Sequence, residues 1–277
     1  MENKKQILLV NDLAGYGKVA LSAMMPIFSH MGFEIFTLPT ALVSNTLDYG
    51  KFEILDTKDY IAKTIQIWRE LQFSFQSISI GFIASDEEAE ILANFCSEQK
   101  KKNTFIFVDP IMGDDGHLYN GISEEAVKNR KRLLTYADLV KPNYTEACLL
   151  TGMEYKKEGV KEKEWNELLK KVQGERNTSV VITSVPVEGK KCCIGFDREN
   201  GEKFCLEYDE LDVRFPGTGD IFSAILLGGI LQGQSLCQSL CHATAQAMKI
   251  VKEMIEKNIE NIDKYRGIPV EQYLDLI

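Results

Sequence analysis

The chain has 277 residues, of which 44% are hydrophobic and 26% are charged, and its formal net charge at pH 7 is −9. This composition is typical of a globular chain that can bury a sizeable core, in one large domain or two small ones. The acidic balance and the lack of a long basic block argue against nucleic acid as a partner. The apolar run Ile7–Val10 is too short for a signal peptide or a membrane span. We therefore expect a cytoplasmic protein with no membrane partner.

The seven cysteines are odd in number and form no Cys-x-x-Cys pair. Most of them lie inside apolar segments, where a thiol packs as a small hydrophobic side chain. We expect free thiols in a reducing compartment rather than a zinc site or a disulfide framework.

Short apolar runs alternate with amphipathic runs through the first two thirds of the chain. The predicted strands cover residues 7–10, 33–39, 77–81, 104–108, 138–141 and 180–183, and the predicted helices cover 19–31, 58–71, 87–100, 124–134, 145–150 and 161–173. Continuous apolar strands are expected where helices cover both faces of a parallel sheet. The alternation therefore predicts an α/β fold with a mostly parallel central sheet.

The pattern changes after residue 185. Residues 192–196 and 203–208, joined by a turn at Asn200-Gly201, predict a small antiparallel hairpin. A long apolar helix then ends near Leu231, and a last helix runs from Ser235 to about Ile259. No internal repeat, low-complexity tract or flexible linker interrupts the chain. We expect a single domain over residues 1–277.

Polar clusters follow the predicted strands or open the long apolar helix. In open α/β sheets, ligands bind beyond the carboxyl ends of the strands, so these clusters should converge on one edge. They are Asn11-Asp12, Asp109-Pro110, Pro142-Asn143, Thr183-Ser184 and the segment from Gly217 to Asp220.

The segment Gly217-Thr218-Gly219-Asp220 carries the strongest chemical signal. Its two glycines let backbone N–H groups turn toward one point, and the helix start adds unpaired amides and a positive dipole end. This arrangement predicts an anion hole, in which Asp220 accepts the proton of an alcohol that attacks phosphorus. The alternative is that Asp220 only caps its helix.

Two other clusters contain carboxylates. Asn143 and Glu146 are three residues apart at a helix start, a spacing that suits a hydrated Mg2+ but also an ordinary capping box. Asp109 ends a strand, and the Gly- and Asp-rich stretch after it is either a mobile flap or a solvated turn. Neither a P-loop nor a protein-kinase motif occurs in the sequence. The loop Asn11–Gly17 and the stretch Ser44–Thr46 could offer hydrogen bonds to a polar ring.

Seven motifs in order along the chain resemble those of the pyridoxal kinases of the ribokinase-like superfamily. They are Tyr16-Gly17, Pro39-Thr40, Ser44-Asn45-Thr46 with Tyr49-Gly50, Asp109–Asp114, Pro142–Glu146, Val181–Ser184 and Gly217–Asp220. The resemblance implies a ribokinase-like three-layer sandwich. It implies ATP-dependent phosphorylation of the 5′-hydroxymethyl group of pyridoxal, pyridoxine or pyridoxamine. It also implies Mg2+, ATP as co-substrate, a monovalent cation such as K+, and a homodimer.

The resemblance also implies roles for individual residues. Asp220 would be the base, Gly217, Thr218 and Gly219 would form the anion hole, and Asp109 and Glu146 would hold Mg2+, partly through water. The implied ATP contacts are Asp109, Tyr119, Asn143, Glu146, Thr183 and Ser184, and Ala243 and Ala247 would border the adenine. The implied residues of the ring site are Asp12, Ser44, Thr46, Asp48, Phe82 and Asp220.

Two residues depart from the pattern of many pyridoxal kinases. Asp12 stands where serine is common, and Phe82 stands where several members carry tyrosine. The hydroxymethylpyrimidine kinases of thiamin synthesis often have the aspartate, and they are an alternative with the same chemistry at a primary alcohol. A non-catalytic vitamin-binding or regulatory module is a second alternative, against which Asp220, Asn143 and Glu146 argue.

Overall fold

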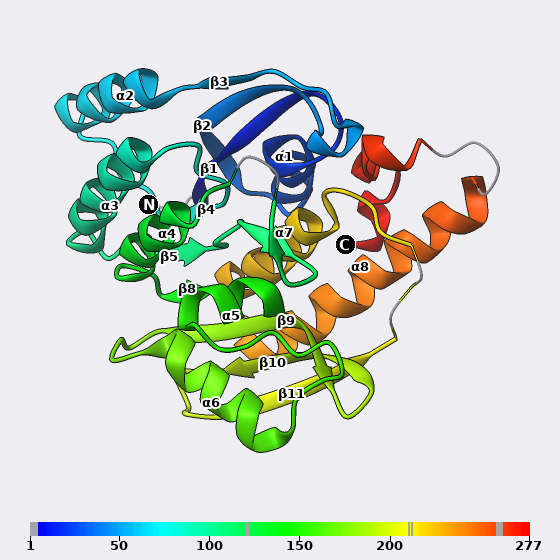
Figure 1. Ribbon diagram of the computed structural model, residues 1–277. Coiled ribbons are helices and arrows are strands. Elements are labelled where there is room, and N and C mark those ends of the chain that lie inside the picture. The colour runs from blue at the N-terminus through cyan, green and yellow to red at the C-terminus, as the bar shows by residue number, and fades with distance from the viewer. Residues whose placement is uncertain (1–4, 120–121, 210, 212, 259–262) are drawn as a thin grey trace. The chain divides into compact units, whose positions relative to one another are not determined.

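The computed structural model describes residues 5–119, 122–209, 211, 213–258 and 263–277. The chain divides into two compact units, one of residues 1–78 and 211–277 and one of residues 79–210. Each unit has parallel strands and helices of its own (Figure 1). The single domain expected over residues 1–277 stays a prediction.

The first unit is built on two long parallel strands, β1 (Gln6–Tyr16) and β2 (Glu34–Asn45). The short strand β3 (Ile54–Asp56) runs antiparallel to β2. Helix α1 (Ala20–His30) connects β1 to β2 and packs against both. The other elements are α2 (Lys58–Glu70), α7 (Thr218–Leu231), α8 (Leu236–Asn258) and the 3-10 turns η1 (Leu47–Tyr49), η2 (Lys264–Arg266), η3 (Val270–Gln272) and η4 (Leu274–Leu276). The helix end predicted near Ile259 lies outside the described residues.

Strand β1 continues past the polar residues at which the sequence predicted its end. The predicted loop Asn11–Gly17 was wrong, because pairing with β2 resumes at Leu13 and continues to Tyr16. The register shifts after Asn11, which lies opposite Pro39, a residue with no N–H for the ladder. Such irregularities re-aim side chains without ending a strand. Asn11 and Asp12 therefore lie at a bend within the sheet rather than in a free loop.

The second unit contains the parallel strands β5 (Phe105–Val108), β8 (Leu139–Val140) and β9 (Ser179–Val187). The predicted hairpin is confirmed as the antiparallel pair β10 (Lys190–Phe196) and β11 (Lys203–Tyr208). A second antiparallel pair, β6 (Gly113–Asp114) with β7 (His117–Leu118), was not predicted. The helices are α3 (Asp86–Lys100), α4 (Glu125–Leu134), α5 (Tyr144–Thr151) and α6 (Glu162–Gln173), and strand β4 (Ser77–Ile80) crosses the boundary between the units.

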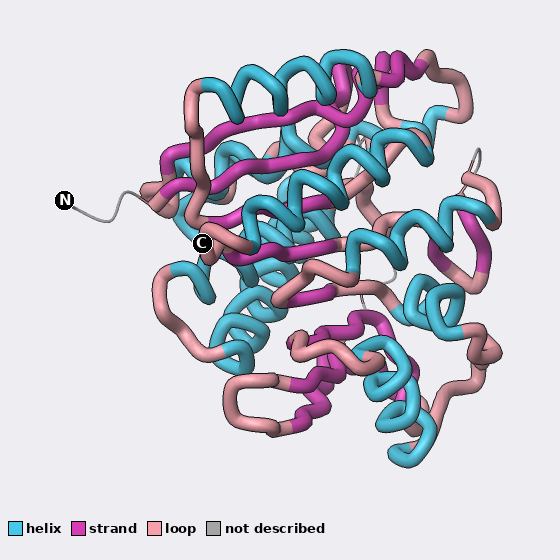
Figure 2. The backbone as a smooth tube through the Cα atoms, turned by 90° about the vertical axis from the view of Figure 1, so that its left-hand side faces the viewer, coloured by secondary structure: helices cyan, strands magenta, loops and turns pink. Residues whose placement is uncertain are grey.

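Burial explains why these runs fold as they do. Ile106, Phe107 and Val108 are almost fully buried, as continuous apolar strands must be between covering helices. Helix α6 buries one apolar face, which includes Trp165 and Leu168, and packs against β9 and β10. Helices run alongside strands, and loops gather at the ends of both (Figure 2). The mostly parallel strands, the helices and the hairpin confirm the predicted α/β class.

No helix among the described residues is both long enough and apolar enough to cross a lipid bilayer.

Candidate functional site

The start of α7 has the geometry of an anion-binding turn. Gly217 is the N-cap residue and has φ +84°, and a Cβ there would lie 2.2 Å from the Lys18 carbonyl oxygen. Only glycine fits both constraints. The first α-helical bond runs from the Ile221 N–H to the Gly217 oxygen, at 2.9 Å. The N–H groups of Gly219 and Asp220 therefore lie in the first turn, where a helix offers no internal acceptor.

Thr218 has local partners in this turn. Its hydroxyl donates to the Phe215 carbonyl oxygen at 2.8 Å, and its N–H lies 3.4 Å from the same oxygen. Gly219 is exposed, and a Cβ there would meet no described atom within 4 Å. The backbone around Gly219 is therefore the more open part of the predicted anion hole.

The N-cap residue of α7 is Gly217, so the alternative that Asp220 is only the N-cap was wrong. Its Oδ2 accepts a hydrogen bond from the Ala20 N–H, the first residue of α1, at 2.8 Å. Its Oδ1 lies 3.5 Å from the Asn11 side-chain nitrogen. The carboxylate thus lies at two helix starts, α7 and α1. Each of its oxygens has two lone pairs, so Oδ1 can still accept a hydroxyl proton.

Ala20 is strained where it meets Asp220. Its φ is +49°, a left-handed conformation that a non-glycine residue adopts at a cost. That conformation accompanies the close contact of the Ala20 N–H with the carboxylate.

Asp12 is half-buried and lies within electrostatic range of Asp220. Burial, and then the negative charge of Asp220, raise the pKa of Asp12 to about 7. A carboxyl group that keeps its proton near neutral pH can donate a hydrogen bond, while its neighbour serves as a base. Asn11 belongs to this group, since its amide contacts Asp220 and its Oδ1 accepts from the Asp12 N–H at 3.1 Å.

The other residues predicted for the ring site have local partners. Thr46 is buried, and its hydroxyl donates to the Tyr265 carbonyl oxygen at 2.6 Å. Ser44 donates to the Asn45 side chain at 2.7 Å and accepts from the Glu53 N–H. Asp48 is exposed in η1, and Phe82 is half-buried in the second unit. Their contact with a substrate stays a prediction.

In the second unit, the carboxyl ends of β5 and β8 carry a buried ion pair. Asp109 follows β5 and Lys141 follows β8, and the Lys141 ammonium lies 2.9 Å from an Asp109 oxygen. Both side chains are less than a tenth exposed. The parallel ladder brings them together, since the Lys141 N–H bonds to the Val108 carbonyl oxygen at 3.0 Å.

Glu146 is the second carboxylate of this cluster. Asn143 and Glu146 form a capping box at the start of α5, as the spacing allowed. One Glu146 oxygen accepts the Asn143 N–H at 2.7 Å, and the other accepts the Met112 N–H at 3.0 Å. Burial and the charge of Asp109 raise the pKa of Glu146, while Lys141 opposes that rise. The residue therefore has a capping role and is also part of a charged cluster.

The Gly- and Asp-rich stretch after Asp109 forms the β6–β7 hairpin. Asp115 and Gly116, the two residues of its turn, have φ +50° and +82°, as tight hairpin turns of the mirror-image kind require. The Asn143 amide donates to the Gly113 oxygen at 2.8 Å, and the Gly116 N–H donates to the Thr145 hydroxyl at 2.9 Å. The hairpin is thus fastened to the start of α5. Tyr119 follows β7, and its N–H bonds to the Met112 oxygen at 3.0 Å.

Thr183 and Ser184 lie at an irregularity in β9. The pairing with β10 shifts register opposite them, and Ser184 has φ +61°. The Thr183 N–H donates to the Pro142 carbonyl oxygen at 3.1 Å, which places Thr183 beside Asn143. The structure therefore brings together Asp109, Asn143, Glu146 and Thr183. Ala243 and Ala247, predicted to border an adenine, are buried in α8, which packs against α7.

The five predicted clusters thus form two groups. Asn11, Asp12 and Asp220 belong to the first unit, and Asp109, Asn143, Glu146 and Thr183 belong to the second. That the two groups make one site stays a prediction.

The fit of Mg2+ can be judged from the second group. Each Glu146 oxygen accepts one N–H and keeps a lone pair, and Asp109 is bound to Lys141 through one oxygen. Such carboxylates fit a Mg2+ that keeps much of its water shell and is also bound by phosphate oxygens. No three His, Cys, Asp or Glu side chains within the described ranges are grouped as a metal cage.

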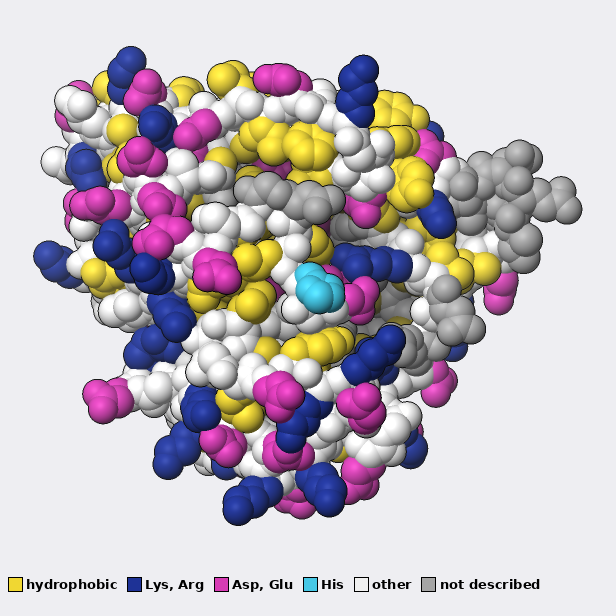
Figure 3. Space-filling model, in the orientation of Figure 1, with side chains coloured by type: hydrophobic (Ala, Val, Ile, Leu, Met, Phe, Trp, Pro, Cys, Tyr) yellow, Lys and Arg dark blue, Asp and Glu magenta, His cyan; other side chains and the backbone are white. Residues whose placement is uncertain are grey.

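Lys141 is the functional candidate that the sequence reasoning missed. Its signal was a lysine directly after a buried strand and before Pro142-Asn143, a place where a charge must find partners inside the protein. The seven cysteines are free thiols, as expected. On the face drawn in Figure 3, acidic and basic side chains are mixed rather than gathered by sign.

Comparisons with known proteins cover nearly the whole chain. A family model described as phosphomethylpyrimidine kinase matches residues 22–268. A crystal structure from Bacteroides thetaiotaomicron, assigned as a phosphomethylpyrimidine kinase and containing pyridoxal, superposes with a TM-score of 0.92 at 33% identity, over 99% of this chain and 96% of that one. The pyridoxal kinase of Lactobacillus plantarum gives 0.87 at 27% identity, over 98% and 95%.

A curated relative is also named as a kinase of vitamin B6 compounds. The pyridoxine/pyridoxal/pyridoxamine kinase of Bordetella avium is 29% identical, over 83% of this chain and 79% of its own. Together, these similarities confirm the predicted fold and the resemblance stated from the motifs.

Proposed function

Because the chain belongs to the phosphomethylpyrimidine kinase family, we propose that it transfers the γ-phosphoryl group of ATP to the 5′-hydroxymethyl group of pyridoxal, pyridoxine or pyridoxamine. The predicted class of enzyme, a phosphotransferase with an alcohol group as acceptor, is confirmed by the relatives and solved structures. The choice of vitamin B6 as substrate is supported by the names of those relatives and by the pyridoxal in the Bacteroides structure.

The observation that carries the proposed mechanism is the placement of Asp220. Its carboxylate lies in the first turn of α7, fixed through Oδ2 by the Ala20 N–H. In this proposal the other oxygen takes the proton of the attacking hydroxyl group. The N–H groups of the α7 start then bind the charge of the transferred phosphoryl group, in an orientation set before the reaction begins.

Two further groups complete the proposed mechanism. Asp12, whose pKa is raised to about 7, donates a hydrogen bond in its protonated form to an acceptor on the substrate ring. Asp109 and Glu146 would hold Mg2+, partly through water, and Asn143, Thr183, Ser184 and Tyr119 would lie near the ATP. When bound, Mg2+ supplies charge neutralisation for the phosphate oxygens. A homodimer and a cytoplasmic location are also part of the proposal, and light scattering of the purified protein tests the dimer.

The test combines a substrate panel with one substitution. A coupled assay with ATP and Mg2+ should give turnover with pyridoxal, pyridoxine or pyridoxamine. Asp220→Asn should lower kcat by about 10³-fold, within the usual range for loss of a general base. Calorimetry should show that the variant still binds ATP. Asp59→Asn, an exposed aspartate in α2, is the matched control and should keep full activity.

Hydroxymethylpyrimidine is the second candidate substrate, favoured by the description of the family model and by Asp12. Comparison of kcat/KM for the two ring types decides between them. A higher kcat/KM with hydroxymethylpyrimidine would overturn the choice of vitamin B6. Full activity of Asp220→Asn would overturn Asp220 as the base. No phosphorylation of any ring in the panel would overturn the kinase proposal and favour a vitamin-binding module.

A further inference from the structure

Lys141 is a buried cation to which the proposed mechanism gives no task. Its side chain is 6% exposed, and its ammonium group lies 2.9 Å from Asp109. It also acts on Glu146, whose ionised form it favours. One ammonium group therefore lies among two buried carboxylates, at strand ends where the phosphates of ATP are proposed to bind.

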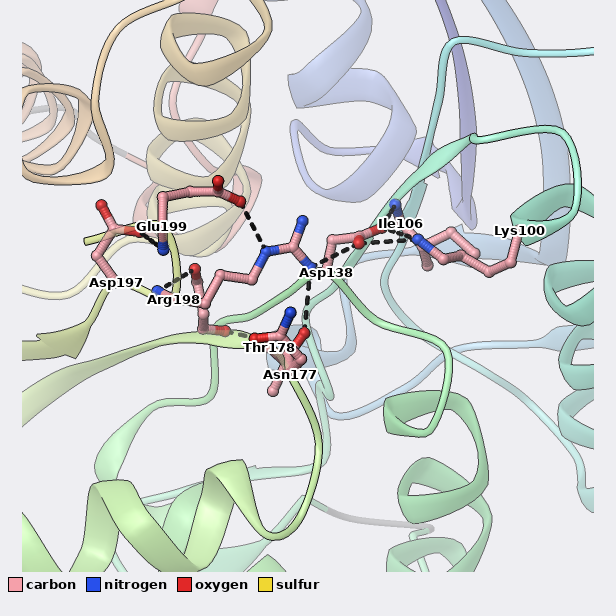
Figure 4. Close-up of polar contacts among 9 residues, drawn as sticks. Lys100, Ile106, Asp138, Asn177, Thr178, Asp197, Arg198 and Glu199 are labelled. Atoms are coloured by element: carbon pink, nitrogen blue, oxygen red, sulfur yellow. Dashed lines mark hydrogen bonds and ion pairs between the residues drawn. The ribbon is translucent and has the colours of Figure 1, made fainter. Parts of the chain in front are cut away.

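The opposite end of the same strand shows a different arrangement. Asp138, just before β8, accepts hydrogen bonds from Lys100 at 2.7 and 2.8 Å, from Arg198 at 2.7 Å and from the Ile106 N–H at 2.8 Å (Figure 4). There, two cations and a backbone donor satisfy one carboxylate. The contacts of that group account for a structural role, because it leaves no excess of negative charge.

The Lys141 cluster is built differently, because its Asp109 carboxylate is contacted by one ammonium group, while Glu146 lies in the field of both Lys141 and the buried Arg130 guanidinium. A buried carboxylate is costly unless a cation accompanies it, and Lys141 supplies that charge beside Asp109. Hydrated Mg2+ is the cation proposed for this place. The ammonium group of Lys141 differs from a bound ion because it is covalently attached to the chain and is in place once the protein has folded. Its single charge and compact form are those of a small monovalent cation.

We infer that Lys141 is a positioning residue that serves as a built-in monovalent cation, holding the Asp109 and Glu146 carboxylates in place for Mg-ATP. The inference rests on the proposed function, since it assigns Mg-ATP to this cluster. It also revises the expectation of a K+ requirement. A kinase that carries its own ammonium group at this point needs no added K+.

The first experiment uses the unaltered enzyme. Turnover is measured with ATP, Mg2+ and pyridoxal in tetramethylammonium buffer, with and without K+ at constant ionic strength. Turnover should change by less than about twofold, since the internal cation is already in place. A dependence of tenfold or more on K+ would overturn the inference.

The second experiment removes the charge. Lys141→Met should lower kcat/KM for Mg-ATP by about 100-fold. Added NH4+ or K+ should raise the kcat/KM of this variant again by at least about tenfold. Tetramethylammonium, which is too large for the vacated space, should restore none. Lys141→Arg keeps the charge and should need no added cation. Lys100→Met, the matched control at the other end of β8, should show no rescue by any cation.

Melting temperature gives a readout that needs neither metal nor nucleotide. Without Mg2+ and ATP, Lys141→Met should melt about 10 °C below the unaltered protein, and NH4+ should raise its melting temperature while leaving that of the unaltered protein unchanged. Failure of cations to raise either the melting temperature or the activity of Lys141→Met would overturn the inference. A higher KM for ATP without rescue would instead assign Lys141 to direct phosphate binding.

These outcomes separate the inference from the proposed function. Absence of turnover by the unaltered enzyme would reject the proposed function. The cation-dependent melting temperature of Lys141→Met would then still test the built-in cation. If Lys141→Met does not fold, Lys141→Arg and the K+ dependence of the unaltered enzyme decide the question.

Discussion

The two ends of β8 hold buried carboxylates in different ways. At its amino end, Asp138 is held by Lys100, Arg198 and a backbone N–H. At its carboxyl end, Lys141 contacts Asp109, and both Lys141 and Arg130 act on Glu146. The Asp138 carboxylate accepts four hydrogen bonds from within the fold, whereas Asp109 and Glu146 are the carboxylates that we propose to hold Mg2+. The two residues of β8 thus separate the Asp138 network, which stabilises the fold, from the Lys141 cluster, which we propose to be functional.

The largest expected effect is on activity, at the carboxyl end. Asp109→Asn should lower kcat by about 10³-fold, because a charged group proposed to hold Mg2+ becomes neutral. Its melting temperature should change by only a few degrees, since Glu146 still balances Lys141. Steady-state kinetics and thermal unfolding of one preparation measure both. An active but strongly destabilised Asp109→Asn would break the contrast between the two ends.

The next effect is on stability, at the amino end. Asp138→Ala leaves Lys100, Arg198 and the Ile106 N–H without their shared acceptor, so unfolding should occur about 10 °C lower. At 20 °C, where the variant is folded, kcat/KM should stay within about twofold of the original. Loss of activity in the folded variant would show that the Asp138 network is not purely structural.

The smallest expected effect is on the pH dependence of stability, and it concerns a third carboxylate, Asp12. The pKa of Asp12 is raised from 3.8 to about 7 in the folded protein, so the folded state binds this proton more tightly than the unfolded state does. The associated stability is present below about pH 4 and is lost as the pH rises toward 7. Asp12→Asn, which resembles the protonated form, should therefore gain a few degrees in melting temperature over the original at pH 8.

The same comparison at low pH is its control. At pH 4 the original Asp12 also carries its proton, so the two proteins should melt at similar temperatures. A gap that does not change between pH 4 and pH 8 would contradict the raised pKa of Asp12. Asp48→Asn, an exposed aspartate of the same unit, should show no such dependence on pH.

Much of the fold followed from local pattern. The apolar runs marked the buried strands, because a strand covered on both faces must be apolar throughout. The spacing of Asn143 and Glu146 indicated a capping box, and the structure contains it. The glycines before Asp220 indicated the turn at α7, where only Gly217 fits against Lys18. In each case neighbours in the chain fix the geometry.

Other features depend on residues far apart in the chain. The continuation of β1 past Asp12 required β2 to supply pairing partners. The contact of Asp220 with Ala20 joins residues two hundred positions apart, and no local spacing predicts it. Lys141 looked like an ordinary lysine after a strand, until the sheet placed it beside Asp109.

The order of residues along the chain was therefore enough to predict the α/β class, the superfamily and the types of residue that we propose to carry the chemistry. Periodicity, glycine positions and capping signals are short-range properties that a linear sequence displays directly. The tertiary structure decided which charges meet, and hence that Asp220 binds the start of α1, that the pKa of Asp12 rises to about 7, and that Lys141 lies beside Asp109. Burial and charge proximity set these properties, and both arise only when distant segments pack together.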